Sequence, residues 1–238
     1  MTPSVPIHVR PTTELAERVL LPGDPGRALA LAQALLEKPL MFNHHRGLWG
    51  YTGKAADGEP LTIQSTGMGG PSAAIVLHEL IALGARRAVR VGTCGALDGT
   101  LQLGDVVVAR EAIAADGTSR ALGAGERVAA DAALTASLER AAAGDAATIV
   151  STDLFYEPER ERERAWRAAG AVAVEMEAAT LFALGARLQT PVACVLTVSD
   201  LLGAEDAAGQ ARRVHIDDDA LLVAAEQMAR LALDALTV

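Results

Sequence analysis

Short apolar stretches run repeatedly into glycine-rich turns that are followed by helical patterns, and this alternation is the strongest constraint on the fold. One such unit covers residues 17–36, another covers residues 61–83, and the apolar stretch 89–97 also ends among glycines. Strands that alternate with helices are typical of α/β proteins, in which helices cover the faces of a sheet. The pattern therefore predicts an α/β sandwich with a largely parallel or mixed sheet.

The remaining elements follow from the same periodicities, with apolar stretches predicting strands and amphipathic or capped stretches predicting helices. Further strands are expected within 41–53 and at 106–109, 149–150, 171–174 and 192–198. Further helices are expected at 130–143 and over the run of alternating Glu and Arg that starts at Pro158. Another should follow residues 175–179 and continue to about Leu188, and a last one should start at Asp217–Asp219. Residues 114–128 and 203–212 are polar or rich in glycine and alanine, so both are expected to be surface loops.

Two helices have apolar positions that predict their buried faces. For the helix that ends near residue 83, these positions are Ile75, Leu77, Leu80, Ile81 and Leu83. For the C-terminal helix, they are Leu221, Leu222, Ala225, Met228, Leu231 and Ala232. Apolar residues at this spacing lie on one side of a helix and face the core.

The composition limits the size of the protein core and its partners. The chain has 238 residues and no recognisable linker, which favours a single domain over residues 1–238. Half of the residues are hydrophobic but only 3% are aromatic, so the core must consist mainly of Ala, Val and Leu. The formal net charge of -9 argues against a nucleic-acid or anionic-membrane surface. No apolar stretch is long enough for a membrane span, and the N-terminal residues do not resemble a signal peptide.

The two cysteines, Cys94 and Cys194, each lie inside an apolar stretch. Their spacing fits neither a metal site nor a disulfide framework. Two buried thiols suit a reducing cytoplasm, which is the expected location. His44 and His45 are adjacent, so in a strand they would face opposite sides and could not bind one metal together.

Arg90 lies inside an apolar strand, and Thr93 follows where the backbone becomes rich in glycine. Arginine is rarely buried without an anionic partner. A cation, a hydroxyl and glycine-freed N–H groups at a strand end suit a phosphate. The alternative is an ion pair between Arg90 and an internal carboxylate, and this stretch alone leaves both open.

A second candidate for anion binding is the turn Gly23–Arg27. Asp24 is a good N-cap and Pro25 a good first helical residue, so the turn should present N–H groups at a helix N-terminus. Arg27 in the first turn opposes the helix dipole unless an anion lies there. An ordinary capped turn would have the same sequence.

Acidic residues follow two of the other strands. Glu175 and Glu177 occupy a strand-to-helix junction, where burying both is costly unless something binds them. Carboxylates accept hydrogen bonds from the two hydroxyls of a ribose, although one of the pair could simply cap the helix. Asp200, after Ser199, is either an N-cap or a site residue. His8 lies in a proline-rich arm that is either frayed or contributes to a site on a neighbouring subunit.

Six motifs in order closely resemble the hexameric nucleoside phosphorylases, the purine nucleoside and uridine phosphorylase family. They are Gly-Asp-Pro-Gly-Arg at 23–27, Arg-Gly-Leu-Trp-Gly-Tyr-Thr-Gly at 46–53, Ser-Thr-Gly-Met-Gly-Gly-Pro-Ser at 65–72, Arg-Val-Gly-Thr-Cys-Gly-Ala at 90–96, Val-Glu-Met-Glu-Ala-Ala at 174–179 and Val-Ser-Asp at 198–200. The resemblance extends from about Pro6 to the C-terminal helix. It implies a three-layer α/β/α sandwich with a central mixed, partly barrel-like sheet.

The resemblance also implies roles for individual residues. Phosphate would be bound by Gly23, Arg27, Arg90 and Thr93, with Arg46 donated by the adjacent subunit. Ribose would be bound by Glu175, Met176 and Glu177, with His8 donated by the neighbour. The base would lie against Phe155, Val174 and Ser199. Asp200 would donate a proton to purine N7, assisted by Arg213, for which Arg212 could substitute.

Departures from the uridine phosphorylases favour a purine substrate. Where those enzymes use Gln and Arg to bind uracil, this chain has Glu159 and Glu161. The uridine phosphorylases also lack an acid at the position of Asp200. Gly47 replaces a glutamate that helps to bind potassium in some of them, so no metal is expected. The expected reaction is phosphorolysis of purine ribonucleosides to base and ribose 1-phosphate, in nucleoside salvage. It needs no cofactor, because inorganic phosphate is a co-substrate.

The expected assembly is a homohexamer, a trimer of dimers, with His8 and Arg46 crossing to the neighbouring site. Alternatives within the family are a uridine phosphorylase and a 5′-methylthioadenosine phosphorylase. A hydrolytic nucleosidase would not need Arg27, Arg46 and Arg90 for phosphate. A catalytically silent nucleoside- or phosphate-binding protein would not need both Glu177 and Asp200.

Overall fold

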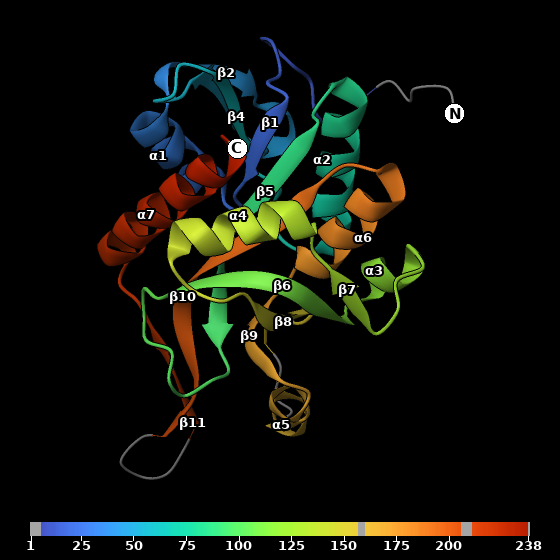
Figure 1. Cartoon of the computed structure of the whole chain (residues 1–238), viewed down its shortest axis with the longest axis vertical. Coiled ribbons are helices and arrows are strands. Elements are labelled where there is room, and N and C mark those ends of the chain that lie inside the picture. The colour runs from blue at the N-terminus through green and yellow to red at the C-terminus, as the bar shows by residue number, and fades with distance from the viewer. Residues whose placement is uncertain (1–5, 157–159, 206–210, 238) are drawn as a thin grey trace.

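The computed structural model describes residues 6–156, 160–205 and 211–237, and within them eleven strands form one sheet (Figure 1). The strands are β1 (Arg18–Leu21), β2 (Glu37–Asn43), β3 (Gly50–Lys54), β4 (Pro60–Gln64), β5 (Arg87–Ala96), β6 (Val106–Ala115), β7 (Arg127–Ala129), β8 (Ala147–Thr152), β9 (Ala171–Glu175), β10 (Val192–Glu205) and β11 (Ala211–His215). The helices are α1 (Pro25–Leu35), α2 (Gly70–Leu83), α3 (Gly117–Ala121), α4 (Ala132–Ala142), α5 (Arg160–Ala168), α6 (Ala178–Leu188) and α7 (Asp218–Leu236), with a 3₁₀ turn η1 (His45–Gly47).

The sheet is mixed, as predicted. Its strand order is β11-β10-β6-β8-β9-β5-β1-β4-β3-β2, and β7 pairs with β6. Strand β5 is parallel to β1 and β10 but antiparallel to β9. Because β10 pairs with both β5 and β6, the strands β5, β10, β6, β8 and β9 close a ring of pairings. This ring brings the C-terminal ends of β5 and β10 next to each other.

Helices cover both faces of the sheet, which confirms the three-layer α/β/α arrangement (Figure 1). On one face, Leu31 of α1, Leu138 of α4 and Met228 of α7 belong to one buried apolar cluster. On the other, Leu77 and Leu80 of α2 pack in a second cluster with α6. Many buried positions in both clusters are Ala, Val or Leu, as the scarcity of aromatic residues predicted. Small side chains allow close packing of helices on the sheet.

Two segments expected to be loops contain regular structure. Strand β6 continues to Ala115, and the alternation of buried Ala112 and Ala114 marks its inner face. Helix α3 follows, because Asp116 accepts a hydrogen bond from the backbone N–H of Ser119 at 2.8 Å. The prediction of a loop over 114–128 was therefore wrong, because alanine has no strong preference for strands.

The expected loop 203–212 is also partly wrong. Strand β10 extends to Glu205, and β11 begins at Ala211 and pairs with it in antiparallel fashion. Residues 206–210 of the predicted loop lie outside the described part of the chain. The backbone hydrogen bonds between the two strands, and not their side-chain pattern, extend the sheet here.

The predicted buried faces of two helices are partly confirmed, since Leu77 and Leu80 of α2 and Ala225, Met228 and Ala232 of α7 are buried. In α2, Val76, Leu77 and Leu80 are buried, whereas Ile75 is 42% exposed. In α7, the buried positions are mainly alanines together with Met228, and Leu222 is 45% exposed. The buried side of α7 combines several alanines with Met228, Leu233 and Leu236, so it is centred on other positions than the largest side chains alone predict.

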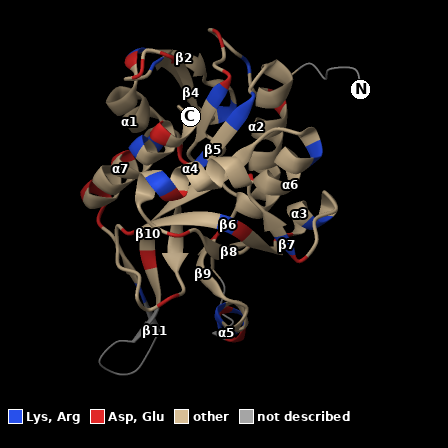
Figure 2. Ribbon diagram, viewed as in Figure 1, with Lys and Arg blue, Asp and Glu red and all other residues tan. Residues whose placement is uncertain are grey.

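The charged run is the helix α5, which carries both signs of charge, as Figure 2 shows. Its predicted start at Pro158 lies outside the described residues, as does Glu159. No helix in the described part of the chain is long and apolar enough to cross a membrane.

Candidate active site

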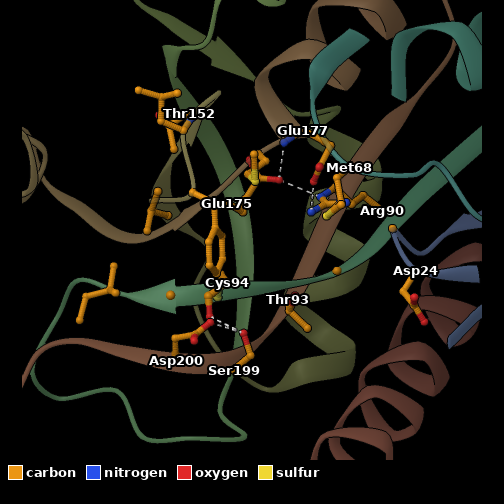
Figure 3. A pocket seen from close by; sticks show the side chains of 18 of the residues that line it. Asp24, Met68, Arg90, Thr93, Cys94, Thr152, Glu175, Glu177, Ser199 and Asp200 are labelled. Carbon is orange, nitrogen blue, oxygen red and sulfur yellow. Dashed lines mark hydrogen bonds and ion pairs between the residues drawn. The ribbon is translucent and has the colours of Figure 1, made fainter. Parts of the chain in front are cut away.

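A cavity of about 340 Å³ opens where β1, β5 and β10 end, between these strands and the junctions after β8 and β9 (Figure 3). Twelve of the residues singled out from the sequence line it: Gly23, Arg27, Arg90, Thr93, Phe155, Val174, Glu175, Met176, Glu177, Ser199, Asp200 and Arg213. These residues come from stretches far apart in the chain. Their convergence at the C-terminal edge of parallel strands is a common arrangement for ligand sites in α/β proteins.

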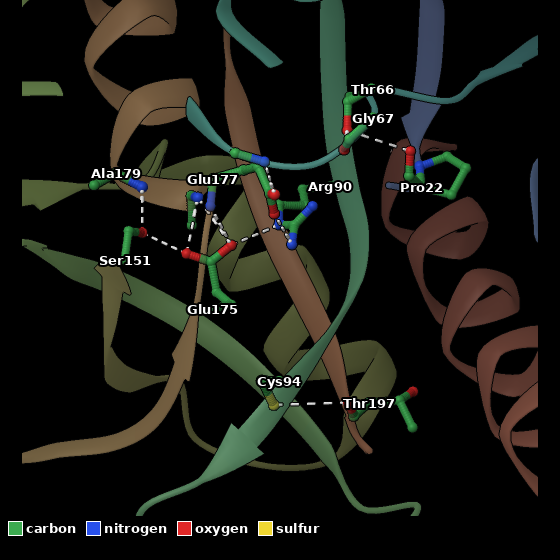
Figure 4. Close-up of polar contacts among 12 residues, drawn as sticks. Pro22, Thr66, Gly67, Arg90, Cys94, Ser151, Glu175, Glu177, Ala179 and Thr197 are labelled. Atoms are coloured by element: carbon green, nitrogen blue, oxygen red, sulfur yellow. Dashed lines mark hydrogen bonds and ion pairs between the residues drawn. The ribbon is translucent and has the colours of Figure 1, made fainter. Parts of the chain in front are cut away.

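Arg90 is buried and is held by two carboxylates (Figure 4). Its Nε donates to Oε2 of Glu175 at 2.8 Å, and its Nη2 contacts Oε2 of Glu177. Its Nη1 has no hydrogen-bond partner in the described structure. Buried donors are rarely left without an acceptor. The internal ion pair is thus confirmed, and one donor of Arg90 is still free for an anion.

Glu175 fixes this arrangement rather than offering a free acceptor. Its carboxylate also accepts hydrogen bonds from Ser151 Oγ and from the backbone N–H groups of Glu177 and Ala178. The distances from these two backbone nitrogens are 2.8 and 2.9 Å. Its position after β9 therefore joins Arg90, β8 and the start of α6.

Glu177 is the N-cap residue of α6 and lines the cavity. Its Oε1 accepts a hydrogen bond from the backbone N–H of Gly69 at 2.5 Å, which ties the turn before α2 to the site. Burial raises the pKa of Glu177, and the negative charge of Glu175 adds to this, although Arg90 acts in the opposite direction. The carboxylate is therefore held close to a cation at the edge of the cavity.

Arg27 lies at the same end of the cavity as Arg90. Asp24 is the N-cap of α1, and its carboxylate accepts the backbone N–H of Arg27 at 2.6 Å, as the Pro25 pattern predicted. Burial lowers the pKa of Arg27, Asp24 raises it, and the positive charge of Arg90 lowers it. Two arginines that repel each other, beside a helix N-terminus and the hydroxyl of Thr93, have the chemistry that suits an anion.

The other end of the cavity holds Asp200, which is 6% exposed. Its Oδ2 lies 2.7 Å from Oγ of Ser199, and its Oδ1 contacts Nδ1 of His215. Asp200 lies inside β10, so the alternative that it is an N-cap was wrong. The N-cap of α7 is Asp217.

An aromatic side chain and a cation lie beside this acid. The guanidinium carbon of Arg213 lies 4.2 Å from the ring centroid of Phe155. Both side chains line the cavity together with Val174. Such a surface can stack against a flat heteroaromatic ring.

Two predicted residues do not line the cavity of their own chain. The backbone N–H of His8 donates to the Glu79 carboxylate at 2.8 Å, and its ring lies away from the site. Arg46 is exposed in η1, with a left-handed φ of 60°. The N-terminal arm and η1 are in contact, because Nδ1 of His45 lies within hydrogen-bond distance of the carbonyl oxygen of His8.

Sequence reasoning missed several residues of the site. Glu163 and Trp166 of α5 line the cavity, although the sequence pattern predicted only a helix there. Their separation by three positions places them on one helical face, and Trp166 is one of only two tryptophans in the chain. His215 was missed because its contact with Asp200 depends on the unexpected strand β11. Within the described ranges, no three His, Cys, Asp or Glu side chains are grouped so as to hold a metal ion.

A cavity with arginines at one end and a buried acid at the other suits an enzyme that transfers a group to or from an anion. The chain matches the family model of the phosphorylase superfamily over residues 17–237. It therefore belongs to the phosphorylase superfamily.

Individual relatives agree with this membership. The chain is 36% identical over 222 residues to the DeoD-type purine nucleoside phosphorylase of Geobacillus kaustophilus, covering 89% of this chain and 93% of the relative. It is also 36% identical to the enzyme of that name from Caldanaerobacter subterraneus, covering 90% and 95%. A crystal structure of uridine phosphorylase from Vibrio fischeri superposes with a TM-score of 0.84 at 26% identity, covering 98% and 97%.

Proposed function

We propose that this protein catalyses phosphorolysis of purine ribonucleosides, giving the free base and ribose 1-phosphate. The observation that carries the proposal is the free Nη1 of Arg90 in a cavity that also contains Arg27 and, at its far end, Asp200. The relatives named as purine nucleoside phosphorylases support the same substrate class.

At the anion end, Arg27, Arg90 and Thr93 would bind inorganic phosphate, and the backbone of Gly23 would add an N–H group. Glu177 would accept hydrogen bonds from the ribose hydroxyls, with Met176 packed against the sugar. A phosphate oxygen would then lie next to C1′ of the nucleoside. Positioning and charge stabilisation account for much of the rate enhancement in reactions of this kind.

At the base end, the purine would stack against Phe155 and lie beside Val174 and Ser199. As phosphate attacks C1′, the electrons of the glycosidic bond move into the purine through an oxocarbenium-like transition state. A proton from Asp200 to N7 would neutralise the leaving base, with help from Arg213 across the Phe155 ring. General-acid assistance of this kind contributes about 10²–10⁴-fold. The reaction as proposed needs phosphate as co-substrate and no further cofactor.

We further propose a homohexamer, a trimer of dimers, in which His8 and Arg46 complete the site of a neighbouring subunit. Around these residues, the arm and the β2–β3 region expose large apolar side chains, including Ile7, Met41 and Trp49. Exposed apolar surface of this kind is typical of interfaces between proteins. The two buried thiols fit a cytoplasmic enzyme of purine salvage.

The assay that tests this function follows release of free base from inosine, adenosine, 5′-methylthioadenosine and uridine, with and without phosphate. We expect phosphate-dependent release from a purine ribonucleoside. Release that does not need phosphate would identify a nucleosidase, and faster cleavage of uridine than of inosine would identify a uridine phosphorylase, as in the solved Vibrio fischeri structures.

The Asp200→Asn variant tests the acid. We expect cleavage of inosine to fall by about 10²-fold or more, because the amide cannot give up a proton to the leaving base. Phosphate binding, measured by protection against thermal unfolding, should be unchanged. An unchanged rate would show that Asp200 has only a structural role.

A further inference from the structure

The side chain that contacts Asp200 from the neighbouring strand is His215. The two residues are direct cross-strand partners in the antiparallel pair of β10 and β11. Nδ1 of His215 contacts Oδ1 of Asp200, while Oγ of Ser199 donates a hydrogen bond to Oδ2. Oδ2 therefore accepts a hydrogen bond from the protein, whereas Oδ1 accepts none in the described structure and has the imidazole of His215, a group that can carry a proton, in ion-pair contact with it.

Arg213 and His215 project from the same face of β11, because they are two residues apart in a strand. Arg213 lies over the ring of Phe155, whereas His215 lies behind Asp200 and does not line the cavity. The structure thus separates two tasks on one strand: Arg213 contacts the surface for the base, and His215 contacts the acid.

Exposure gives His215 access to a proton that Asp200 lacks. The side chain of Asp200 is 9% exposed, and that of His215 is 59% exposed. Histidine is the side chain that most readily exchanges protons with water near neutral pH. A buried acid must be recharged after each turnover, and the exposed imidazole offers a path from solvent.

We infer that His215 is a positioning residue that orients Asp200 and supplies the proton that Asp200 delivers to the leaving purine. This inference rests on the proposed function. The proton leaves Nδ1 of the imidazolium, passes through the Asp200 carboxyl and ends on purine N7. The glycosidic electron pair stays with the purine, a phosphate oxygen bonds to C1′, and the neutral imidazole regains a proton from water.

The test compares two nucleosides that differ in their need for this proton. Inosine needs protonation at N7, whereas 7-methylinosine already carries a positive charge on the same ring and leaves without an acid. For His215→Ala, we expect kcat on inosine to fall by about tenfold or more, and kcat on 7-methylinosine to stay within about twofold of the original. His215→Asn can still donate a hydrogen bond but cannot pass on a proton, so it should be as slow on inosine as His215→Ala.

Val214→Thr is the matched control, because it changes the adjacent residue on the opposite face of β11. It should leave both rates unchanged, and thermal unfolding should show that all the variants are folded. The side chain of His215 is largely exposed, so its removal leaves no cavity in the core and the variant should fold.

Each contrary result has its own meaning. If the unaltered protein releases no base from inosine with phosphate, the proposed function is wrong and this inference with it. If the protein is active but His215→Ala cleaves both nucleosides at the original rates, or slows both equally, only the role of His215 is overturned. Full activity of His215→Asn on inosine would also overturn the proton-supplying role.

Discussion

A single arginine organises the anion end of the site through its three nitrogen atoms. Nε and Nη2 of Arg90 are taken by Glu175 and Glu177, so the guanidinium is fixed before any ligand arrives. Burial alone would lower the pKa of Arg90, but the two carboxylates raise it, so the cation persists in the core. The free Nη1 can then bind an anion without first giving up another partner.

Replacing Arg90 should therefore affect both stability and binding. For Arg90→Gln, we expect the free energy of unfolding to fall by about 3–5 kcal/mol, because two buried carboxylates lose their counter-ion. The KM for phosphate should rise strongly. Urea unfolding and phosphate-dependent rates measure the two effects.

The double variant Arg90→Gln/Glu175→Gln separates the effect on stability from the effect on phosphate binding. It removes one of the uncompensated charges, so part of the lost stability should return while phosphate binding stays weak. Recovery of both together would indicate that Arg90 acts only as a structural partner of Glu175.

The sequence could indicate the kinds of residue in the site but not which of them touch. The stretch 89–97 left open whether Arg90 binds an anion or a carboxylate, and the structure shows the carboxylates while leaving one donor free. Glu175 lies 85 positions away from Arg90, and Asp200 reaches His215 only through the β10–β11 pairing. Contacts of this range depend on the sheet order, which local patterns do not contain.

At the scale of elements, β5 needs a glycine beside Arg90. A Cβ at Gly92 would lie 2.7 Å from Cζ of Arg90, whose guanidinium cannot move away without breaking its ion pairs. We expect Gly92→Ala to displace the guanidinium and to raise the KM for phosphate by about tenfold, the effect of losing about 1.4 kcal/mol of binding.

Gly99→Ala is the control for this substitution. No atom lies within 4 Å of a Cβ built at Gly99, so the KM for phosphate should not change. Equal effects of the two substitutions would argue against a specific clash at Gly92.

Helix α2 holds the N-terminal arm through Glu79. Its carboxylate accepts hydrogen bonds from the backbone N–H groups of Ile7, His8 and Val9. Burial would raise the pKa of Glu79, but these N–H groups outweigh it and lower the pKa below its usual value. The possibility of a frayed arm, raised by its prolines, does not hold for these three residues.

This attachment should depend on pH. The contribution of Glu79 is fully present above its unfolded pKa, about 4.3, and is lost as the pH falls through the lower folded pKa. The protection of the residue 7–9 amides against hydrogen exchange, measured relative to their intrinsic rates at each pH, should fall over that range. In Glu79→Ala, these amides should exchange quickly at neutral pH as well, and the KM for nucleoside should rise if His8 serves a neighbouring site.

Slow exchange of these amides in Glu79→Ala would show that other contacts hold the arm. Glu226→Ala is a suitable control, because its carboxylate pairs with Arg230 on the exposed side of α7. It should leave exchange in the arm unchanged.

At the scale of the whole molecule, the proposed hexamer predicts complementation between inactive variants. Arg46→Ala should damage the site to which Arg46 is donated, whereas Asp200→Asn damages the site of its own chain. Mixed and reassembled, the two variants should recover about a quarter of the original activity, because half of the dimers are mixed and one of their two sites is intact.

No recovery in mixtures that light scattering shows to be reassembled would contradict exchange of Arg46 between subunits. The control is Arg46→Ala taken through the same unfolding and reassembly without Asp200→Asn, and it should stay inactive. A monomer of full activity would contradict the assembly altogether.

The overall architecture was more predictable than its details. Alternating strands and helices were enough to predict the layered fold, because this pattern has few stable solutions. The extended β6 and the β10–β11 pair were not predictable, because alanine-rich and glycine-rich stretches have weak local preferences. Of the predicted site residues, the two absent from the cavity are His8 and Arg46, for which a neighbour had been expected.

The pairing of β5 with β10 sets a fixed spacing within the molecule. Thr93 pairs with Thr197 and Gly95 pairs with Asp200 in one parallel pairing, with an irregularity in the register between Val198 and Asp200. Changing the separation between phosphate and acid would require slipping this buried ladder, which would turn side chains to the wrong face. If the site works as proposed, we therefore expect substitutions that alter the preference for the base to lie in α5 and β11, which line or flank the cavity outside this ladder.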